Sequence, residues 1–431
     1  MPSARLIGAV ALNTLLLSAG LLVPWLVLAA LVLDGLLLAA FLIDFRRAAS
    51  EAVTADRRWP PMLVQGAETT LVVEVASRSP RPVTVRLRDG LAPALAARAA
   101  RQELTLPAAG RSRWEQRLVP RRRGEHSVAP LTARVLGPWG LAWAQRDLVA
   151  PEFHRIFPQV RWGGRVGQLL ALAQRRSLGV PDCQLLGLGS ELYALREYLP
   201  GDPLNRIHWK ATARHRRLVS REETWERGAR LVILLDAART MASMDGNRSK
   251  LDHALAAALA LTRVAAARGD RVTVIAFSDR VERVVRASSR MAEVYGRLYD
   301  CEATLEEPAY DLAVEAALRA SPRQATVMMF TSVVDLAAGE LLGGALLRLE
   351  QRRHRPILLN LQDPELAALA EEPPAEVPDA YAQATALEIL LANRRLTRRM
   401  RAAGVRMVQP MADRLPLAAL DSYLEIFRRT A

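Results

Sequence analysis

The sequence of 431 residues predicts a multidomain chain of the α/β plus β class. Two long apolar stretches open the chain, short runs of strand-forming residues follow, and strand-like and helix-like segments alternate in the last part. These three observations predict four parts: a transmembrane helical hairpin over residues 1–48, a small antiparallel β-sandwich-like domain over 49–160, a linker over 161–229 and a doubly wound α/β domain over 230–431.

The composition is basic and poor in aromatic residues. The formal net charge is +14, and aromatic residues make up 5% of a chain that is 51% apolar. A basic balance favours acidic partners such as anionic lipid, nucleic acid or an acidic protein, although high genomic GC content also produces arginine-rich chains. Cys183 and Cys301 have neither the number nor the spacing of a disulfide framework or a zinc site, which is consistent with a reducing compartment.

The apolar stretches at 6–23 and 24–43 are each close to the ~20 residues that cross a bilayer as a helix. Pro24 between them suits a tight turn. Arginines flank both stretches, which places both ends of the hairpin in the cytoplasm by the positive-inside rule; they are Arg5, Arg46, Arg47, Arg57 and Arg58. We expect a protein of the plasma (inner) membrane with a cytoplasmic soluble region, and a cleaved signal peptide is the alternative.

Asp34 lies within the second apolar stretch. An acidic residue at the centre of a membrane helix costs roughly 2.5–3.5 kcal/mol on insertion scales, which many Leu and Val residues can offset. We expect Asp34 to lie near a helix–helix contact, and the alternative is a polar contact with another membrane subunit.

The segment after the hairpin has the pattern of a small β-sandwich. Strand-forming residues cluster or alternate at 69–75, 82–87 and 113–118, with turn residues between them. We expect an exposed loop at 121–124 and a turn at 137–141 that is anchored by Trp139. No catalytic grouping is present in this segment.

From residue 230 onward the pattern predicts a doubly wound sheet. Ser249 and Asp252 form a helix-start pattern, and Gly269 ends that helix. Strands are expected at 231–235, 271–277, 281–285, 326–330, 357–361 and 405–408, and helices at 291–299, 311–320, 339–351, 380–403 and 417–429. Ligands bind at the carboxyl ends of strands in such sheets, where Asp236 and Thr331 fall. A carboxylate followed by a hydroxyl, as in Asp236 and Thr240, can face a divalent cation.

A dense group of charged and aromatic residues surrounds the linker turn at 200–203. This signature stretch includes Arg196, Glu197, Tyr198, Gly201, Asp202, Arg206, His208, Trp209, Lys210 and Arg214. It suits either a docking surface or an internal ion-pair network. A hydrolase that uses His208 and Asp202 is a further alternative, although no second carboxylate cluster with metal-ligand spacing supports it.

The signature stretch, followed by a strand that ends in Asp236, resembles the domain-of-unknown-function 58 family. The resemblance implies a membrane-anchored relative of von Willebrand factor A (vWA) domains, often encoded beside MoxR-type AAA+ ATPases. It also implies a metal-ion-dependent adhesion site in the crevice. In that pattern Asp236 matches the first aspartate and Thr240 the second hydroxyl, while Ala238 replaces the first hydroxyl.

The second and third loops of this adhesion site depart from the family pattern. After the fourth strand, Ser332 follows Thr331 where the family has a carboxylate, and Asp335 is retained. The intermediate threonine would fall near 307–310, where no hydroxyl matches, and Thr304 is a poor substitute. One carboxylate with one or two hydroxyls is too small a ligand set for tight Mg²⁺ binding. We therefore expect a degenerate crevice in which Mg²⁺ is optional.

These observations predict a membrane-anchored scaffold rather than an enzyme, since no Ser-His-Asp, phosphate-loop or zinc-helix pattern is present. The hairpin would contact membrane lipid, and the crevice would dock a protein partner such as an AAA+ ATPase during assembly or maturation of a complex. The alternatives are a metal-dependent hydrolase or nucleic-acid-binding protein that uses residues 196–214, and an extracytoplasmic adhesin. We consider nucleic acid an unlikely partner.

Overall fold

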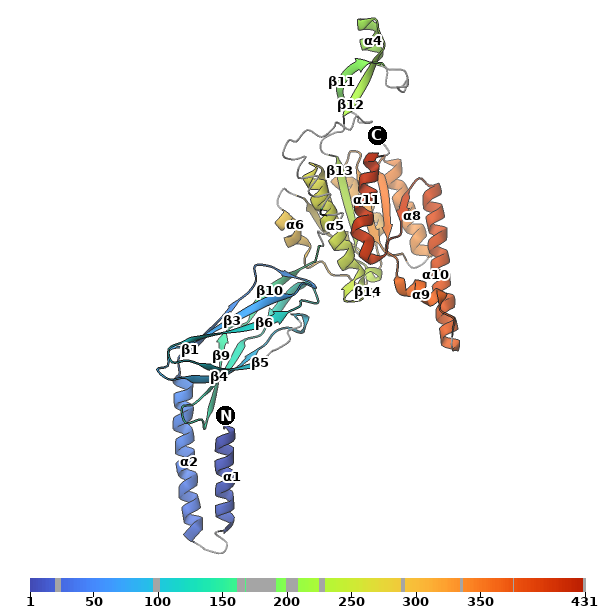
Figure 1. Ribbon diagram of the computed structural model, residues 1–431. Helices are drawn as coiled ribbons and strands as arrows, with labels where there is room; N and C mark the ends of the chain where they lie inside the picture. The colour runs from blue at the N-terminus through green and yellow to red at the C-terminus, as the bar shows by residue number, and fades with distance from the viewer. Residues whose placement is uncertain are drawn as a thin grey trace. The chain divides into compact units, whose positions relative to one another are not determined.

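The computed structural model describes residues 1–19, 25–95, 101–160, 167, 191–198, 208–224, 229–287, 291–333, 336–374 and 376–428. The chain divides into two compact units, Met1–Gln159 and Val160–Ala431 (Figure 1). The first unit contains the apolar helices and the sandwich, and the second contains the signature stretch and the α/β domain. Our finer division into four parts stays a prediction.

The first unit begins with two apolar helices that pack against each other, α1 (Ala4–Ala19) and α2 (Trp25–Ser50). Among the described helices, α2 is the one long and apolar enough to cross a membrane, with a mean hydropathy of 2.7. Asn13 of α1 donates hydrogen bonds to Asp34 (2.7 Å) and to the Ala30 carbonyl oxygen (3.0 Å) of α2. Asp34 therefore lies at a helix–helix contact, as predicted.

The carboxyl end of α2 is joined to the sandwich through Asp44, which is fully buried. Its Oδ1 accepts a hydrogen bond from the Trp139 N–H (2.8 Å), and its Oδ2 accepts from Leu141 (2.8 Å) and Ala142 (2.9 Å). A Cβ added at Gly137 would come within 2.4 Å of this carboxyl group, so glycine is required there. The predicted turn around Trp139 thus holds the end of α2.

The sandwich consists of three sheets with strand orders β1-β3-β6, β5-β4-β8-β9 and β2-β10-β7. Its core lies between the first two sheets, where alternate Val and Leu residues are buried. The predicted strands at 69–75, 82–87 and 113–118 are confirmed as β3, β4 and β6. The strands are β1 (Val53–Arg58), β2 (Leu63–Val64), β3 (Thr69–Ser77), β4 (Val83–Asp89), β5 (Arg101–Leu106), β6 (Arg111–Leu118), β7 (Gly124–Val128), β8 (Leu131–Leu136), β9 (Trp143–Val149) and β10 (Glu152–Phe157).

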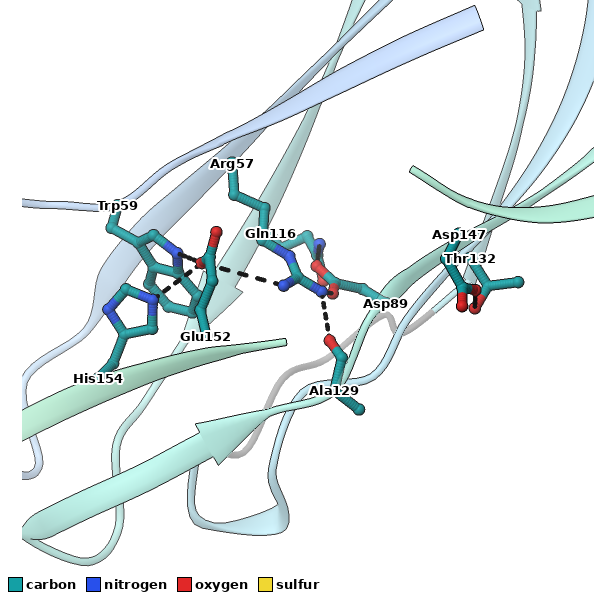
Figure 2. A network of polar contacts seen from close by, with 9 residues as sticks. All are labelled: Arg57, Trp59, Asp89, Gln116, Ala129, Thr132, Asp147, Glu152 and His154. Atoms are coloured by element: carbon teal, nitrogen blue, oxygen red, sulfur yellow. Dashed lines mark hydrogen bonds and ion pairs between the residues drawn. The ribbon is translucent and has the colours of Figure 1, made fainter. Parts of the chain in front are cut away.

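A buried ion pair links the two main sheets of the sandwich (Figure 2). The Arg57 guanidinium on β1 lies 2.5 Å from Asp89 at the end of β4, and both side chains are 0% exposed. Arg57 also donates to the Ala129 carbonyl oxygen (2.8 Å), and Gln116 donates to the second oxygen of Asp89 (2.6 Å). These bonds satisfy the buried carboxylate, which would otherwise be expensive to remove from water.

The second unit begins with an antiparallel hairpin that carries part of the signature stretch. It comprises β11 (Glu191–Glu197), α4 (Trp209–His215) and β12 (Val219–Thr224).

A six-stranded sheet with the order β17-β16-β13-β18-β19-β20 forms the body of the second unit. Its strands are β13 (Arg230–Asp236), β16 (Arg271–Phe277), β17 (Val281–Arg286), β18 (Thr326–Thr331), β19 (Arg355–Asn360) and β20 (Arg406–Val408). The helices are α5 (Lys250–Ala267), α6 (Met291–Leu298), α7 (Tyr310–Ala320), α8 (Leu336–Gln351), α9 (Pro364–Glu371), α10 (Val377–Ala402) and α11 (Leu415–Arg428). A two-residue pairing of β14 (Met244–Asp245) with β15 (Arg248–Ser249) precedes α5.

Helices cover both faces of this sheet, as Figure 1 shows for α5 and α11 on one face and α8 on the other. Alternate residues of β13 explain why. Leu231 and Ile233 pack with α5 and α11, whereas Val232 and Leu234 pack with α7, α8 and α10. This arrangement confirms the predicted mixed α/β organisation with helices on both sides.

Two features of the α/β domain differ from the prediction. The edge strand β17 runs antiparallel to β16, because the three residues 278–280 between them are too few for a parallel crossover. The helix α9 was not predicted, since it spans only eight residues, begins at Pro364 and is followed by Pro373 and Pro374. The other predicted strands and helices are present within a few residues of their expected limits.

Candidate functional site

Asp236 ends the central strand β13 and is fully buried. Its Oδ1 accepts a hydrogen bond from the Ala238 N–H (2.8 Å), and its Oδ2 accepts one from the Thr331 hydroxyl (2.5 Å). Burial raises the pKa of Asp236 to about 6, although these two hydrogen bonds oppose the shift and nearby Glu307 adds to it. A carboxyl group that titrates near neutrality is common at functional sites.

Thr331 ends the neighbouring strand β18 and is also fully buried. Its hydroxyl lies 3.4 Å from the Tyr310 hydroxyl at the start of α7. The order in which strands are added to the sheet changes side between β13 and β18, which are parallel neighbours, and doubly wound sheets bind ligands at such a switch point. The structure therefore brings Asp236 and Thr331 together at the carboxyl edge, as the sequence predicted.

A buried lysine faces the next residue of the same loop. Lys250, 3% exposed, donates a hydrogen bond to the Ser332 hydroxyl (3.2 Å) and pairs with Asp363 (3.2 Å). Ser332 is 2% exposed and donates to the Leu361 carbonyl oxygen (3.3 Å). A protein ammonium group thus lies beside the position where the family pattern has a carboxylate.

The position of Lys250 follows from how α5 begins. Ser249 is the N-cap, its hydroxyl accepts from the Asp252 N–H (3.1 Å), and the Asp252 carboxylate accepts from the Ser249 N–H (3.1 Å). Because of this capping box, α5 begins at Lys250. The sequence predicted the cap but not the role of the lysine that follows it.

The loop after β13 forms the rim of the crevice. Arg239 pairs with Glu307 (2.6 Å), and both side chains are substantially exposed. The Thr304 hydroxyl donates to the Ala237 carbonyl oxygen (3.3 Å) and therefore does not face Asp236 as a free ligand. The Thr240 hydroxyl oxygen is buried and has no hydrogen-bond partner among the described residues.

The described residues of the crevice do not fit a magnesium ion. Mg²⁺ demands about six oxygen ligands in octahedral geometry. Both Asp236 oxygens already accept hydrogen bonds, and the Ser332 hydroxyl faces the Lys250 ammonium, which repels a second cation. In the part of the chain that the structure describes, no group of three or more His, Cys, Asp or Glu residues could hold a metal. Asp335 lies outside the described residues.

The signature stretch lies on its own hairpin. His208 caps α4, because its Nδ1 accepts from the Ala211 N–H (3.0 Å). Trp209 is 67% exposed, and Lys210 and Arg214 are exposed on the same helix.

The remaining signature residues lie on β11 or outside the described part. Glu197 is 3.4 Å from Arg217, the Tyr198 N–H donates to the Leu218 carbonyl oxygen (2.9 Å), and Arg196 is opposite Ser220 in the strand register. Gly201, Asp202 and Arg206 lie outside the described residues, so the alternative of a hydrolase that uses His208 and Asp202 stays a prediction.

Three crevice residues were not predicted. Lys250 and Asp363 form the ion pair, and Asn360, 1% exposed, accepts from the Val333 N–H (2.8 Å). A signal for the lysine was available in the sequence, because a cationic side chain directly follows the Ser249 helix cap.

Residues 194–409, half of the chain, match the family described as “Protein of unknown function DUF58”. The chain belongs to this family, in agreement with the resemblance carried by the signature stretch. A comparison with curated proteins finds no match.

Several solved structures are similar to parts of the chain. A CARDB domain from Pyrococcus furiosus matches over 25% of this chain and 93% of its own, with 13% identity and a TM-score of 0.19. Proximal thread matrix protein 1 from the mussel byssus matches over 45% of this chain and 44% of its own, with 12% identity and a TM-score of 0.26. A PapD-like domain of human CEP192 matches over 24% of this chain and 81% of its own, with 12% identity and a TM-score of 0.18. Similarities this weak carry no functional argument.

Proposed function

We propose that this chain is a membrane-anchored scaffold that docks a protein partner through the crevice at the carboxyl edge of its six-stranded sheet. The contact between Asp236 and Thr331 carries the proposal, because it places buried polar groups at the switch point of the sheet. Buried polar groups are expensive, and the apolar core of the sheet does not need them. A crevice lined in this way suits recognition of a polar side chain of a partner.

We include a vWA-like fold in this proposal. Numbered along the chain from β13 to β20, the strands of the sheet have the order 3-2-1-4-5-6, which is a doubly wound order. Helices on both faces and a crevice between the first and fourth strands support the same assignment. Because the described ligand set fits Mg²⁺ poorly, docking would proceed without a metal.

We further propose that α1 and α2 cross the inner membrane as a hairpin and leave the soluble region in the cytoplasm. The apolar length of α2 and the contact between Asn13 and Asp34 support the hairpin. Asp44 supports retention of α2 over cleavage as a signal sequence. Cleavage that removed α2 would also remove Asp44. The N–H groups of Trp139, Leu141 and Ala142 would then lose their acceptor.

A catalytic role for the crevice is not favoured. Ser332 and Lys250 are within hydrogen-bond distance, which superficially resembles a nucleophile beside a base. However, the lysine is also paired with Asp363, the serine donates to a backbone carbonyl, and both residues are buried. These contacts support a structural clamp between α5 and the loop after β18.

The family resemblance suggests a MoxR-type AAA+ ATPase as the partner, and a matched pair of variants tests it. Arg239 is on the crevice rim, whereas Arg348 is on α8 near its carboxyl end. Each side chain is 49% exposed and paired with one acidic residue. Full-length protein carrying Arg239→Glu or Arg348→Glu is purified from native membranes in mild detergent, and co-purified proteins are quantified by mass spectrometry.

We expect the ATPase to co-purify with wild type and with Arg348→Glu. The amount that co-purifies with Arg239→Glu should be at least several-fold lower. Recovery of no AAA+ ATPase and no membrane complex with wild type would contradict the proposal. Equal recovery with all three proteins would remove the crevice as the docking site.

A further inference from the structure

The outward face of the sheet β5-β4-β8-β9 has a groove with a volume of about 590 Å³. This face lies in the first unit and does not depend on the crevice of the α/β domain. The charged residues of this groove are four arginines and one glutamate. We call this surface the arginine face. Its charged members are Arg86, Arg88, Arg101, Glu103 and Arg134.

Strand register sets these side chains in two rows across the sheet. Alternate residues of a strand point to the same face, so Arg86 and Arg88 of β4 both point outward. In the first row Arg86 is opposite Glu103 on one side and Arg134 on the other. In the second row Arg88 is opposite Arg101.

The arginine face contains like charges directly opposite each other, which destabilise a sheet. Arg86 faces Arg134, and Arg88 faces Arg101, across neighbouring strands. Arg86 is balanced by Glu103 at 2.6 Å, and Arg134 donates to Gln145 (2.9 Å). The guanidinium groups of Arg88 and Arg101 have no ion pair with the described residues. Folding alone does not explain this arrangement, and an anionic ligand does.

One contact holds the Arg86 side chain in place on this face. The Arg86 guanidinium lies over the Trp143 ring, 4.4 Å from its centroid, and Trp143 is 8% exposed. The arginine is thus stacked on a rigid, buried surface while its side chain remains 53% exposed. A planar guanidinium fixed in this way can bind a carboxylate through two parallel hydrogen bonds.

We propose that the arginine face binds an extended acidic segment of a partner protein. Side chains two residues apart on a strand repeat at about 6.6 Å. Arg86 and Arg88 therefore match carboxylates at alternate positions of an extended peptide. Arg101 and Arg134 lie on either side of this line and would contact the same carboxylates from neighbouring strands.

Charge and composition favour a peptide over a nucleic acid or a lipid surface. Glu103 is part of the face, and Asp147 flanks it, accepting from Thr132 (3.0 Å). These carboxylates would repel a continuous phosphate backbone or a layer of anionic headgroups. Single-stranded nucleic acid also needs exposed aromatic rings for base stacking, whereas Trp143 is buried beneath Arg86.

Fluorescence anisotropy of a labelled synthetic peptide with alternating glutamate and threonine tests the proposal on the full-length protein in detergent. The test variant carries Arg88→Gln and Arg134→Gln. The control carries Arg111→Gln and Arg117→Gln, which remove the same charge from exposed positions of β6 in the other main sheet. Circular dichroism confirms that each variant is folded.

We expect saturable binding that weakens with salt and falls about tenfold in the test variant but not in the control. An equal loss in both variants, or no loss in either, would overturn the proposal. Parallel titrations with an oligo-dT strand and with phosphatidylglycerol vesicles decide the class of ligand. Tighter binding of either probe than of the peptide at the same salt concentration would overturn the assignment to an acidic protein segment.

Discussion

Asp89 in the first unit and Asp236 in the second are both buried, and these two carboxylates differ in what surrounds them. Asp89 in the sandwich is paired with the Arg57 guanidinium between two sheets. Among the described residues, Asp236 in the α/β domain accepts hydrogen bonds from a hydroxyl and a backbone N–H, and it lies at the carboxyl end of β13. The guanidinium compensates the charge of Asp89, whereas burial without a cationic partner in the described part of the chain raises the pKa of Asp236 to about 6.

The largest effect should come from breaking the paired carboxylate. Asp89→Ala leaves the Arg57 guanidinium buried without its counterion, so we expect the free energy of unfolding to fall by about 3–5 kcal/mol. Chemical denaturation of the full-length protein in detergent measures the loss.

The double variant Arg57→Met with Asp89→Leu is the control, since it removes both charges and should recover most of the stability. If the free energy of unfolding falls by less than about 1 kcal/mol in Asp89→Ala, water reaches the ion pair. Asp89 and Asp236 would then not differ in the way described above.

The uncompensated carboxylate should give a pH dependence instead. The pKa of Asp236 is about 6 in the folded protein, and an unfolded aspartate titrates near 3.9. Between these values the folded state holds the proton more tightly, so the contribution of Asp236 to stability falls as pH rises from about 4 to 6. The total change is about 3 kcal/mol. The free energy of unfolding, measured by chemical denaturation at several pH values in this range, should therefore depend less on pH for Asp236→Asn than for wild type.

A second substitution shows whether the hydrogen bond from Thr331 sets this range. Thr331→Val removes a bond that favours the carboxylate, so the fall in stability should extend to higher pH. Thr326→Val, at the other end of β18, is the matched control and should leave the pH profile unchanged. Identical profiles for Asp236→Asn and wild type would contradict the assigned pKa.

The smallest effect concerns the exposed arginine face and should have the opposite sign. Arg88→Gln removes a charge that directly faces Arg101, so we expect the free energy of unfolding to rise by about 0.2–1 kcal/mol. Arg86→Gln loses both the pair with Glu103 and the repulsion from Arg134, so we expect these opposing effects to leave the free energy of unfolding nearly unchanged. A lower stability for Arg88→Gln would indicate that this arginine serves the fold.

Most of the α/β domain was predictable because its elements have local signals. Apolar runs marked β13, β16 and β18, and the Ser249–Asp252 cap marked the start of α5. The side chains of β17 do not show its direction, but the three residues 278–280 between the expected strands were too few for a parallel crossover and did indicate it.

The candidate site was predictable only where strand ends determine it. Asp236 and Thr331 meet because the carboxyl ends of adjacent parallel strands lie at one edge of the sheet. Lys250 and Asp363 are distant in sequence and come together through tertiary packing of α5 against the loop after β19. The Arg57–Asp89 pair was missed for the same reason, because a charged residue in a strand is normally exposed.

The central claim is that the crevice works without a divalent metal, because hydrogen bonds already occupy both oxygens of Asp236 and the Lys250 ammonium lies beside Ser332. Isothermal titration of Mg²⁺ and Mn²⁺ into the full-length protein in detergent, with wild type and Asp236→Ala compared, tests this claim most directly. We predict no saturable binding in the micromolar range for either protein. Micromolar binding by wild type that is lost in Asp236→Ala would contradict the account and restore a metal-dependent site.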